Sequence, residues 1–238
     1  MKKLSVLLND SLKNGKRVKV KLLGDSITHG VGGKGFAQKG ERIVEGFEYF
    51  RNPEGFCWAR LMSDYLWGKY GAVVVNNGCS GVRIEFLIDQ FDSLVDDDDD
   101  FIICTIGTNN RHQYKAKGPK RDRGEMIETF YQNILRLNKM FEEREIPVVF
   151  VANIPASAYN EVEDKEDYWR ILHMDDINRQ YKRAREVAGF ELISLYDLAS
   201  EYISERGILI DELLFDGLHS NDEGYRVMFE LLRKELEI

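Results

Sequence analysis

The sequence predicts an α/β protein in which helices cover both faces of a parallel β-sheet. Short apolar runs alternate with longer segments whose apolar residues recur at helical spacing, a pattern typical of βα repeats. Residues 73–75, 101–103 and 148–151 are apolar throughout, as expected for strands buried on both faces. The length of 238 residues suits one such domain, and no repeat or linker divides it. We therefore treat residues 1–238 as a single domain.

The predicted elements follow one another in a regular order. An amphipathic helix comes first and ends near Gly15, and the last helix closes the chain after residue 220. The strands are expected at residues 18–23, 72–76, 101–106, 147–152 and 191–194. Between them, helices are expected at residues 56–70, 84–91, 125–145, 169–188 and 197–204.

Charge and composition exclude several classes of protein. The net charge of −8 argues against a nucleic-acid partner, because phosphate contacts need a basic surface. The first residues begin like a secretion signal, but Asn9 and Asp10 interrupt the apolar stretch too early. No run reaches transmembrane length, so we expect a cytoplasmic protein without a membrane partner. Three cysteines without framework spacing are expected to be reduced thiols: Cys57, Cys79 and Cys104.

Polar residues and glycines follow the first three predicted strands at the point where each strand ends. Gly24-Asp25-Ser26 follows the first strand, Gly78 the second and Asn109 the third. Functional groups gather at the carboxyl ends of parallel strands. A strand that stops at a glycine and then shows a serine is a common way to present a nucleophile. Ser26 is therefore the candidate catalytic centre.

A serine nucleophile needs a base and an orienting acid. Of four histidines, His219 is the best placed, because Asp216 lies three residues before it and Gly217 permits a tight turn between them. Ser220 is expected to cap the closing helix, with Glu223 completing a capping box. This helix would then hold His219 in place.

These motifs resemble those of the SGNH (GDSL) hydrolase family over almost the whole chain. The resemblance implies that Ser26 is the nucleophile and that Asp216 and His219 complete the triad. It also implies an oxyanion hole made by the backbone N–H groups of Ser26 and Gly78 and the side-chain amide of Asn109. The implied fold is a three-layer α/β/α sandwich with a flavodoxin-like five-stranded parallel sheet of order 2-1-3-4-5. Asn110 departs from the pattern, because many members have Asp there.

The expected activity is that of a serine esterase that forms an acyl-enzyme and needs no cofactor. Short acyl groups, acetyl above all, on a carbohydrate or another polar alcohol are the favoured substrates, since the chain is short and lacks an obvious greasy lid. Two alternatives stay open. The protein could be an acyltransferase that uses a sugar hydroxyl as acceptor, or a non-catalytic carbohydrate-binding module on the same scaffold.

Two patterns that suggest ligands have simpler interpretations. Residues 30–35 match G-x-G-x-x-G but do not directly follow a strand, so we interpret residues 30–55 as a rim that selects the substrate. The acid run at residues 96–100 lacks EF-hand spacing and is interpreted as a solvated turn rather than a calcium site. No His, Cys or Asp cluster has metal-ligand spacing, and we predict no metal.

The remaining features are open to a functional and a structural interpretation. His29 could contact substrate, although an exposed loop histidine is favoured. Cys79 is interpreted as a small packing residue. A basic loop could recognise an anionic substrate, although a solvated loop paired with the acidic loop at residues 161–167 is favoured: Lys115, Lys117, Lys120, Arg121 and Arg123. Five aromatic residues could form a pocket wall or cover the sheet edge: Phe36, Phe47, Tyr49, Phe50 and Trp58.

Overall fold

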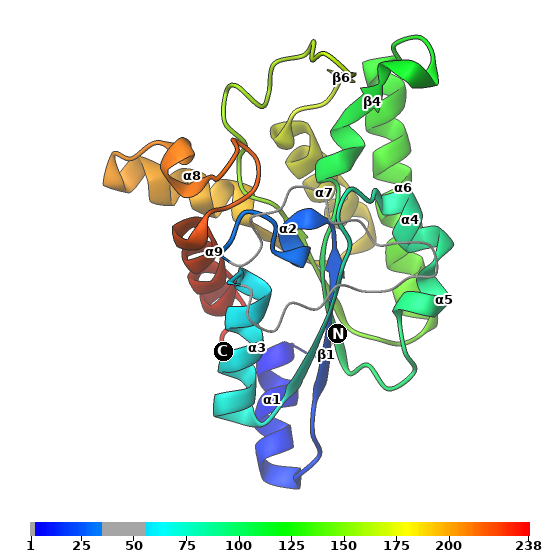
Figure 1. Ribbon diagram of the computed structural model, residues 1–238. Helices are drawn as coiled ribbons and strands as arrows, with labels where there is room; N and C mark the ends of the chain where they lie inside the picture. The colour runs from blue at the N-terminus through cyan, green and yellow to red at the C-terminus, as the bar shows by residue number, and fades with distance from the viewer. Residues whose placement is uncertain (1–2, 35–55) are drawn as a thin grey trace.

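A five-stranded parallel sheet lies at the centre of the molecule (Figure 1). This computed structural model describes residues 3–34 and 56–238. The strand order is β2-β1-β3-β5-β7, and each neighbouring pair is parallel. Counted over the five predicted strands, this is the order 2-1-3-4-5, so the predicted fold is confirmed. The strands are β1 (Lys19–Gly24), β2 (Val73–Gly78), β3 (Phe101–Thr105), β5 (Val148–Ala152) and β7 (Glu191–Ser194).

Helices form a layer on each face of the sheet (Figure 1). One layer holds α1 (Leu4–Asn14), α3 (Trp58–Tyr70), α8 (Leu195–Arg206) and α9 (Asp222–Glu235). The other holds α4 (Ile84–Asp89), α5 (Phe91–Leu94), α6 (Arg123–Glu143) and α7 (Met174–Ala188). The three-layer architecture follows from these two sets.

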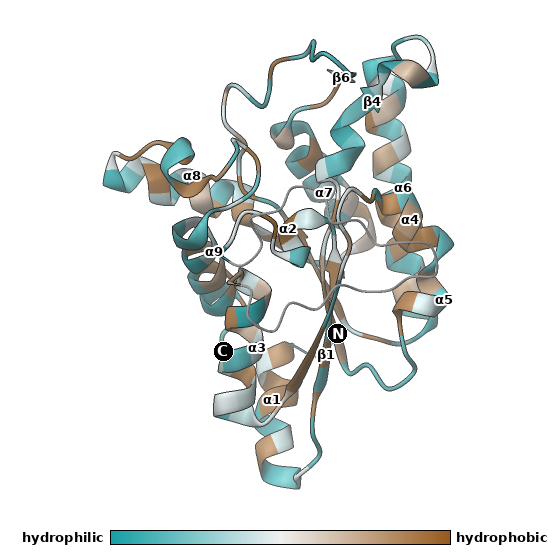
Figure 2. Ribbon diagram, viewed as in Figure 1, coloured by the Kyte–Doolittle hydropathy of each residue, from teal (hydrophilic) through white to brown (hydrophobic). Residues whose placement is uncertain are grey.

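Alternate side chains of the central strands enter two separate apolar cores. In β1, Leu22 packs into the core that includes α3 and α9, and Leu23 packs into the core beneath α6 and α7. In β3, Ile103 packs into the first of these cores and Ile102 into the second. Strands with two buried faces carry apolar residues at successive positions, and the central strands are brown over much of their length in Figure 2. Burying each such side chain stabilises the fold by roughly 1.5–3 kcal/mol.

A second, two-stranded antiparallel sheet was not predicted. It pairs β4 (His112–Tyr114) with β6 (Tyr168–Arg170). The predicted helix at residues 169–188 therefore begins later, at Met174. The reason is that the backbone of Trp169 pairs with Gln113, which holds this stretch extended.

The helix ends show one confirmed and one wrong prediction. The first helix ends at Gly15, which adopts a left-handed conformation as expected. The cap of α9 is Asn221 and not Ser220: the Asn221 side chain accepts the N–H of Gly224 at 2.9 Å. Ser220 instead donates its hydroxyl to the Met228 sulfur at 3.2 Å inside the core.

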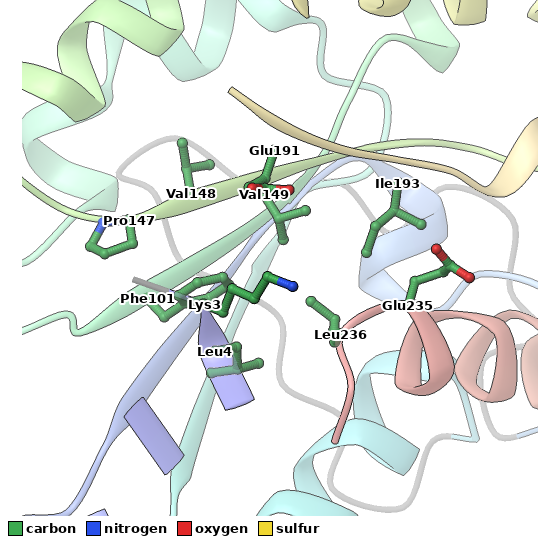
Figure 3. A pocket seen from close by; sticks show the side chains of 10 residues that line it. All are labelled: Lys3, Leu4, Phe101, Pro147, Val148, Val149, Glu191, Ile193, Glu235 and Leu236. Atoms are coloured by element: carbon green, nitrogen blue, oxygen red, sulfur yellow. The ribbon is translucent and has the colours of Figure 1, made fainter. Parts of the chain in front are cut away.

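The strand starts lie at the end of the sheet opposite to Ser26. A small cavity there lies among the first residues of three strands, Phe101, Val148 and Glu191 (Figure 3). Nearby, the ammonium group of Lys3 binds the carboxylate of Glu237 at 2.9 Å, so the residue before α1 and the segment after α9 meet at this end. Among the described residues, no helix is long and apolar enough to cross a membrane.

Candidate active site

Ser26 lies at the turn where β1 passes into the short helix α2 (Ser26–His29), at the carboxyl end of the sheet (Figure 1). Gly24 is needed at this turn, because a Cβ there would overlap the carbonyl of Thr105 on the neighbouring strand. Asp25 caps α2: its side chain accepts the N–H of Ile27 at 3.0 Å. The strand end and the cap together fix where Ser26 points.

The structure brings Ser26, His219 and Asp216 into one chain of hydrogen bonds. Ser26 Oγ lies 2.8 Å from His219 Nε2. On the other side of the ring, His219 Nδ1 lies 2.9 Å from Asp216 Oδ2 and 3.1 Å from Oδ1. Residues that are 193 positions apart in the sequence therefore meet with the geometry of a nucleophile, a base and an orienting acid.

Asp216 is held in its ionised form. Its burial opposes ionisation, but hydrogen bonds from the His219 ring and from the backbone N–H groups of His219 and Leu218 outweigh it and lower the pKa of Asp216 to about 2. An ionised carboxylate can only accept hydrogen bonds, so His219 Nδ1 donates its proton to it. His219 Nε2 is then the basic nitrogen that faces Ser26.

Gly217 shapes the turn between the acid and the base. Its φ is +81°, which favours glycine, and a Cβ at this position would lie 2.5 Å from Ser157 Oγ. The Gly217 carbonyl accepts the N–H of Ser157 at 2.9 Å. The loop after β5 therefore holds the turn that carries Asp216 and His219.

Asn109 can offer a hydrogen-bond donor at the same edge of the sheet. It lies in the 3-10 turn Thr108–Arg111 that follows β3, and its Nδ2 donates to the carbonyl of Val82 at 2.9 Å. A side-chain amide has two hydrogens, so this bond orients the group and leaves one donor. Asn110 is used differently: its side chain accepts from the N–H of Ile84 and donates to Glu85. Asn110 therefore holds the start of α4.

The predicted role of Gly78 in the oxyanion hole is not supported by this geometry. Its N–H donates to Asn76 Oδ1 at 2.9 Å, within the same stretch of chain. Asn76 Nδ2 in turn donates to the carbonyl of Thr28, also at 2.9 Å. A Cβ on residue 78 would lie 2.5 Å from the backbone nitrogen of His29. The glycine is thus required for the close approach of α2 to β2.

Gly81 is a candidate that the sequence reasoning missed. It is exposed, has a φ of +79°, and its N–H donates to no group in the described part of the chain. The preceding residue, Ser80, contacts α2, because its Oγ lies 2.7 Å from His29 Nδ1. The sequence holds two glycines, Gly78 and Gly81, three positions apart. The structure distinguishes them by the hydrogen bond to Asn76, by the contact of residue 78 with His29 and by the exposure of Gly81.

His29 is buried, which corrects the expectation of an exposed loop histidine. It is the last residue of α2, is 1% exposed, and its ring contacts Ser80 in the segment that follows β2. Burial lowers its pKa to about 4, so its ring is neutral at pH 7. His29 therefore acts as a structural link between Ser26 and the residues before Gly81.

Two side chains of the basic loop, Lys115 and Lys120, pair with the acidic loop, in part as expected. Lys115 binds Asp164 at 2.6 Å, and Lys120 lies 3.6 Å from Glu163. Arg121 and Arg123 pair with Glu125 and Asp176 instead, so four of the five basic side chains named above have acidic partners in the described part of the chain. Of the candidate wall aromatics, Trp58 is fully buried in the core, and the other four lie outside the described residues.

The acid run at residues 96–100 forms a turn before β3 in which residues 96–98 are exposed, as predicted. Asp96, Asp98 and Asp99 approach one another closely enough to hold a cation. The ammonium groups of Lys19 and Lys21 already lie among them, with Lys21 Nζ 2.7 Å from Asp96 Oδ2. The lysines supply the compensating positive charge there.

A serine, a histidine and an aspartate hydrogen-bonded at the edge of such a sheet are features of a carboxylic ester hydrolase. The chain belongs to the GDSL-like Lipase/Acylhydrolase family, whose profile matches residues 22–227. A search of curated proteins found no significant match.

Solved structures with the same fold include several esterases. Axe2, an acetylxylan esterase from Geobacillus stearothermophilus, is 17% identical with a TM-score of 0.67, over 93% of this chain and 94% of that one. CEX, a two-domain esterase active on acetylated mannans, is 18% identical with a TM-score of 0.66, over 98% of this chain. The match spans 52% of CEX. LAE5, an enzyme from the metagenome of Lake Arreo, Spain, is 20% identical with a TM-score of 0.67, over 92% and 95% of the two chains.

Proposed function

We propose that this protein hydrolyses short-chain acyl esters, acetyl esters above all, on a carbohydrate or another polar alcohol. The observation that carries the proposal is the hydrogen-bonded chain from Ser26 Oγ through His219 to the ionised Asp216. Two structural relatives support the choice of substrate, since Axe2 is an acetylxylan esterase and CEX is active on acetylated mannans.

In the acylation step, His219 Nε2 takes the hydroxyl proton of Ser26 while Oγ attacks the ester carbonyl carbon. The carbonyl oxygen becomes an oxyanion in the tetrahedral intermediate. When the intermediate collapses, the bond to the alcohol oxygen breaks, and His219 returns the proton to the leaving alcohol. Asp216 stabilises the imidazolium that exists between these two proton transfers.

Deacylation repeats these steps with water. His219 takes a proton from a water molecule whose oxygen attacks the acyl-enzyme, and Ser26 leaves with the proton returned by His219. The acid is released and the enzyme is restored. No external oxidant, metal or cofactor enters this balance.

Three donors are proposed for the oxyanion. The Ser26 N–H is the first amide of α2 and has no acceptor within the helix. The free hydrogen of the Asn109 amide is the second. In place of Gly78 we assign the third to the Gly81 N–H, because it is exposed and lies beside the contact between Ser80 and His29. Neutral donors of this kind stabilise the developing charge without trapping anions.

The test compares Ser26→Ala with Ser200→Ala, which removes an exposed serine hydroxyl in α8. On 4-nitrophenyl acetate, Ser26→Ala is expected to lower kcat/KM by at least about 10³-fold, and Ser200→Ala is expected to match the wild type. Full activity of Ser26→Ala would overturn the mechanism. Across acetyl, butyryl and octanoyl esters, kcat/KM is expected to fall with chain length, and a preference for octanoate would overturn the acetyl assignment.

A fluorophosphonate probe separates catalysis from binding. We expect it to label the wild type and Ser200→Ala at Ser26 and to leave Ser26→Ala unlabelled. An unlabelled wild type would instead favour the non-catalytic carbohydrate-binding module. Product analysis with a sugar acceptor distinguishes hydrolysis from acyl transfer, because transfer yields an acylated sugar in place of free acid.

A further inference from the structure

Arg111 is a fully buried cation close in sequence to the proposed oxyanion donor Asn109. It is 0% exposed, and each nitrogen of its guanidinium group has an acceptor. Nε donates to the carbonyl of Thr108 at 3.1 Å, Nη1 to Glu161 Oε1 at 2.8 Å and Nη2 to Asn160 Oδ1 at 3.0 Å. The first of these bonds closes the 3-10 turn that carries Asn109. The other two reach across to the loop after β5.

The loop that receives Arg111 also holds the turn between Asp216 and His219. Asn160 and Glu161 form a tight turn with Ser157, whose carbonyl accepts their N–H groups at 3.0 and 3.2 Å. The N–H of Ser157 then donates to the Gly217 carbonyl at 2.9 Å. A continuous path of hydrogen bonds thus runs from Arg111 to the turn that carries the triad acid and base.

A second bond joins the same two loops. The side chain of Asn153, directly after β5, donates to Thr108 Oγ1 at 2.9 Å. The Arg111 carbonyl also accepts the N–H groups of Ile171 and Leu172, which fixes the backbone beneath the guanidinium. The position of Arg111 is therefore fixed by hydrogen bonds of both its side chain and its backbone.

Because the guanidinium group of Arg111 is buried, its hydrogen bonds oppose movement of the loop at residues 157–161. Desolvation and the nearby charge of Arg170 lower the pKa of Arg111 to about 9, against the opposing effect of Glu161, so Arg111 is charged at pH 7. A buried charge is tolerated only when its hydrogen bonds are well formed, and the planar fork of arginine cannot be replaced by the point charge of lysine. A displacement of the loop would break several of these bonds at once.

We propose that Arg111 is a positioning residue that holds the oxyanion donor Asn109 in register with Asp216 and His219 through the turn at residues 157–161. The inference rests on the ester hydrolysis proposed above. Arg111 does not touch the reacting atoms in this scheme. It sets the distance between two groups that must act on the same tetrahedral intermediate, for which misplacement by about 1 Å can cost about 10²-fold in rate.

The test uses Arg111→Lys, which keeps the charge, and Glu161→Gln, which keeps the shape of the acceptor and removes its charge. The control is Lys21→Met, because Lys21 is also a buried, ion-paired cation, with its partners Asp96 and Asp99 on the turn before β3. With 4-nitrophenyl acetate, Arg111→Lys is expected to lower kcat about 10- to 100-fold with KM within about 3-fold of the wild type. Glu161→Gln is expected to act in the same direction. Lys21→Met lowers the melting temperature and leaves kcat unchanged at a temperature where it is folded.

Hydrogen–deuterium exchange gives a second measurement that does not depend on activity. In Arg111→Lys, exchange is expected to accelerate in peptides covering residues 155–161 and 214–220, although Arg111 does not contact the second segment. Lys21→Met should leave both unchanged. Wild-type kcat and unchanged exchange at residues 214–220 would each overturn the inference. A wild type without Ser26-dependent activity would defeat the proposed function instead, and the exchange result would still decide whether Arg111 links the two loops.

Discussion

The side-chain nitrogen of Asn109 donates to the carbonyl of Val82 at 2.9 Å, and this bond connects the end of β3 to the segment that follows β2. The next residue, Asn110, accepts the N–H of Ile84, two residues after Val82. Two adjacent asparagines therefore have different tasks. Asn109 keeps one amide hydrogen for the site, whereas Asn110 is used within the structure.

Replacing each of these two asparagines should affect a different property: the first replacement should lower kcat, and the second should lower the free energy of unfolding. Asn109→Ala is expected to lower kcat by about 10²–10³-fold with little change in melting temperature, because it removes an oxyanion donor. Asn110→Ala is expected to cost about 1–3 kcal/mol in the free energy of unfolding, because it leaves buried groups at the start of α4 unpaired. Steady-state kinetics and urea denaturation of both variants measure this. Equal loss of kcat in the two would count against a special role for Asn109.

Asp216→Asn tests the acid of the triad. The amide can donate to His219 Nδ1 and so favours the tautomer in which Nε2 carries the proton and cannot accept from Ser26. We expect kcat to fall by up to about 10⁴-fold with the fold intact. Asp211→Asn is the matched control, since Asp211 is exposed five residues earlier. Wild-type kcat in Asp216→Asn would show that the base is oriented by another group.

Gly217→Ala tests the turn between acid and base. The new Cβ meets Ser157 Oγ at 2.5 Å and adds left-handed strain of about 1–2 kcal/mol, so both kcat and stability should fall. Gly207→Ala carries similar strain at a φ of +64° with open space around its Cβ, and it should cost stability alone. Adding Ser157→Ala to Gly217→Ala should restore part of kcat, because the clashing hydroxyl is gone while the Ser157 N–H remains. No recovery would mean that backbone strain, and not this contact, displaces the turn.

The stability of the fold should depend on pH through His29. Its pKa is about 4 when folded and about 6.5 when unfolded, so the unfolded chain binds more protons between these values. The stabilisation is fully present above pH 6.5 and is lost as the pH falls towards 4, by roughly 3 kcal/mol. His112, whose pKa burial and nearby arginines lower to about 3, adds to the same trend.

Urea denaturation at pH 7, 5.5 and 4.5 measures this dependence. His29→Asn should flatten the slope, because asparagine does not titrate. His173→Asn is the control, since His173 is exposed and caps α7, a position that asparagine also favours. A slope that is the same in wild type and His29→Asn would contradict the assignment.

The sequence predicted the sheet well because its strands are strongly patterned. Residues 101–103 and 148–151 are apolar at successive positions. This pattern is typical of a strand that is buried on both faces. The strands β4 and β6 are only three residues long, and nothing in their composition distinguishes them from loop or helix. Their pairing depends on contacts between Gln113 and Trp169, 56 residues apart, which local periodicity does not contain.

The site was predictable where residue type alone restricts the choice. The chain has only 4 histidines, and His219 alone follows an aspartate at the spacing of Asp216 with a glycine between them. The structure places His219 within hydrogen-bond distance of both Ser26 and Asp216. Gly78 and Gly81 could not be distinguished from the sequence. The decisive contacts are the bond that the Gly78 N–H donates to Asn76 Oδ1 and the close approach of residue 78 to His29. The role of Arg111 could not be predicted either, because Arg111 precedes a run of basic residues and differs from them in its burial.

The ion pair between Lys3 and Glu237 has a practical consequence for engineering. Since the two ends of the described chain meet at the edge of the sheet away from Ser26, a short peptide linker could join them without crossing the catalytic face. A circular permutant opened at an exposed turn such as Gly118 would then keep the same hydrogen-bonded sheet. Attachment of the protein to a solid support through either end would leave the ester-binding edge turned towards the solvent.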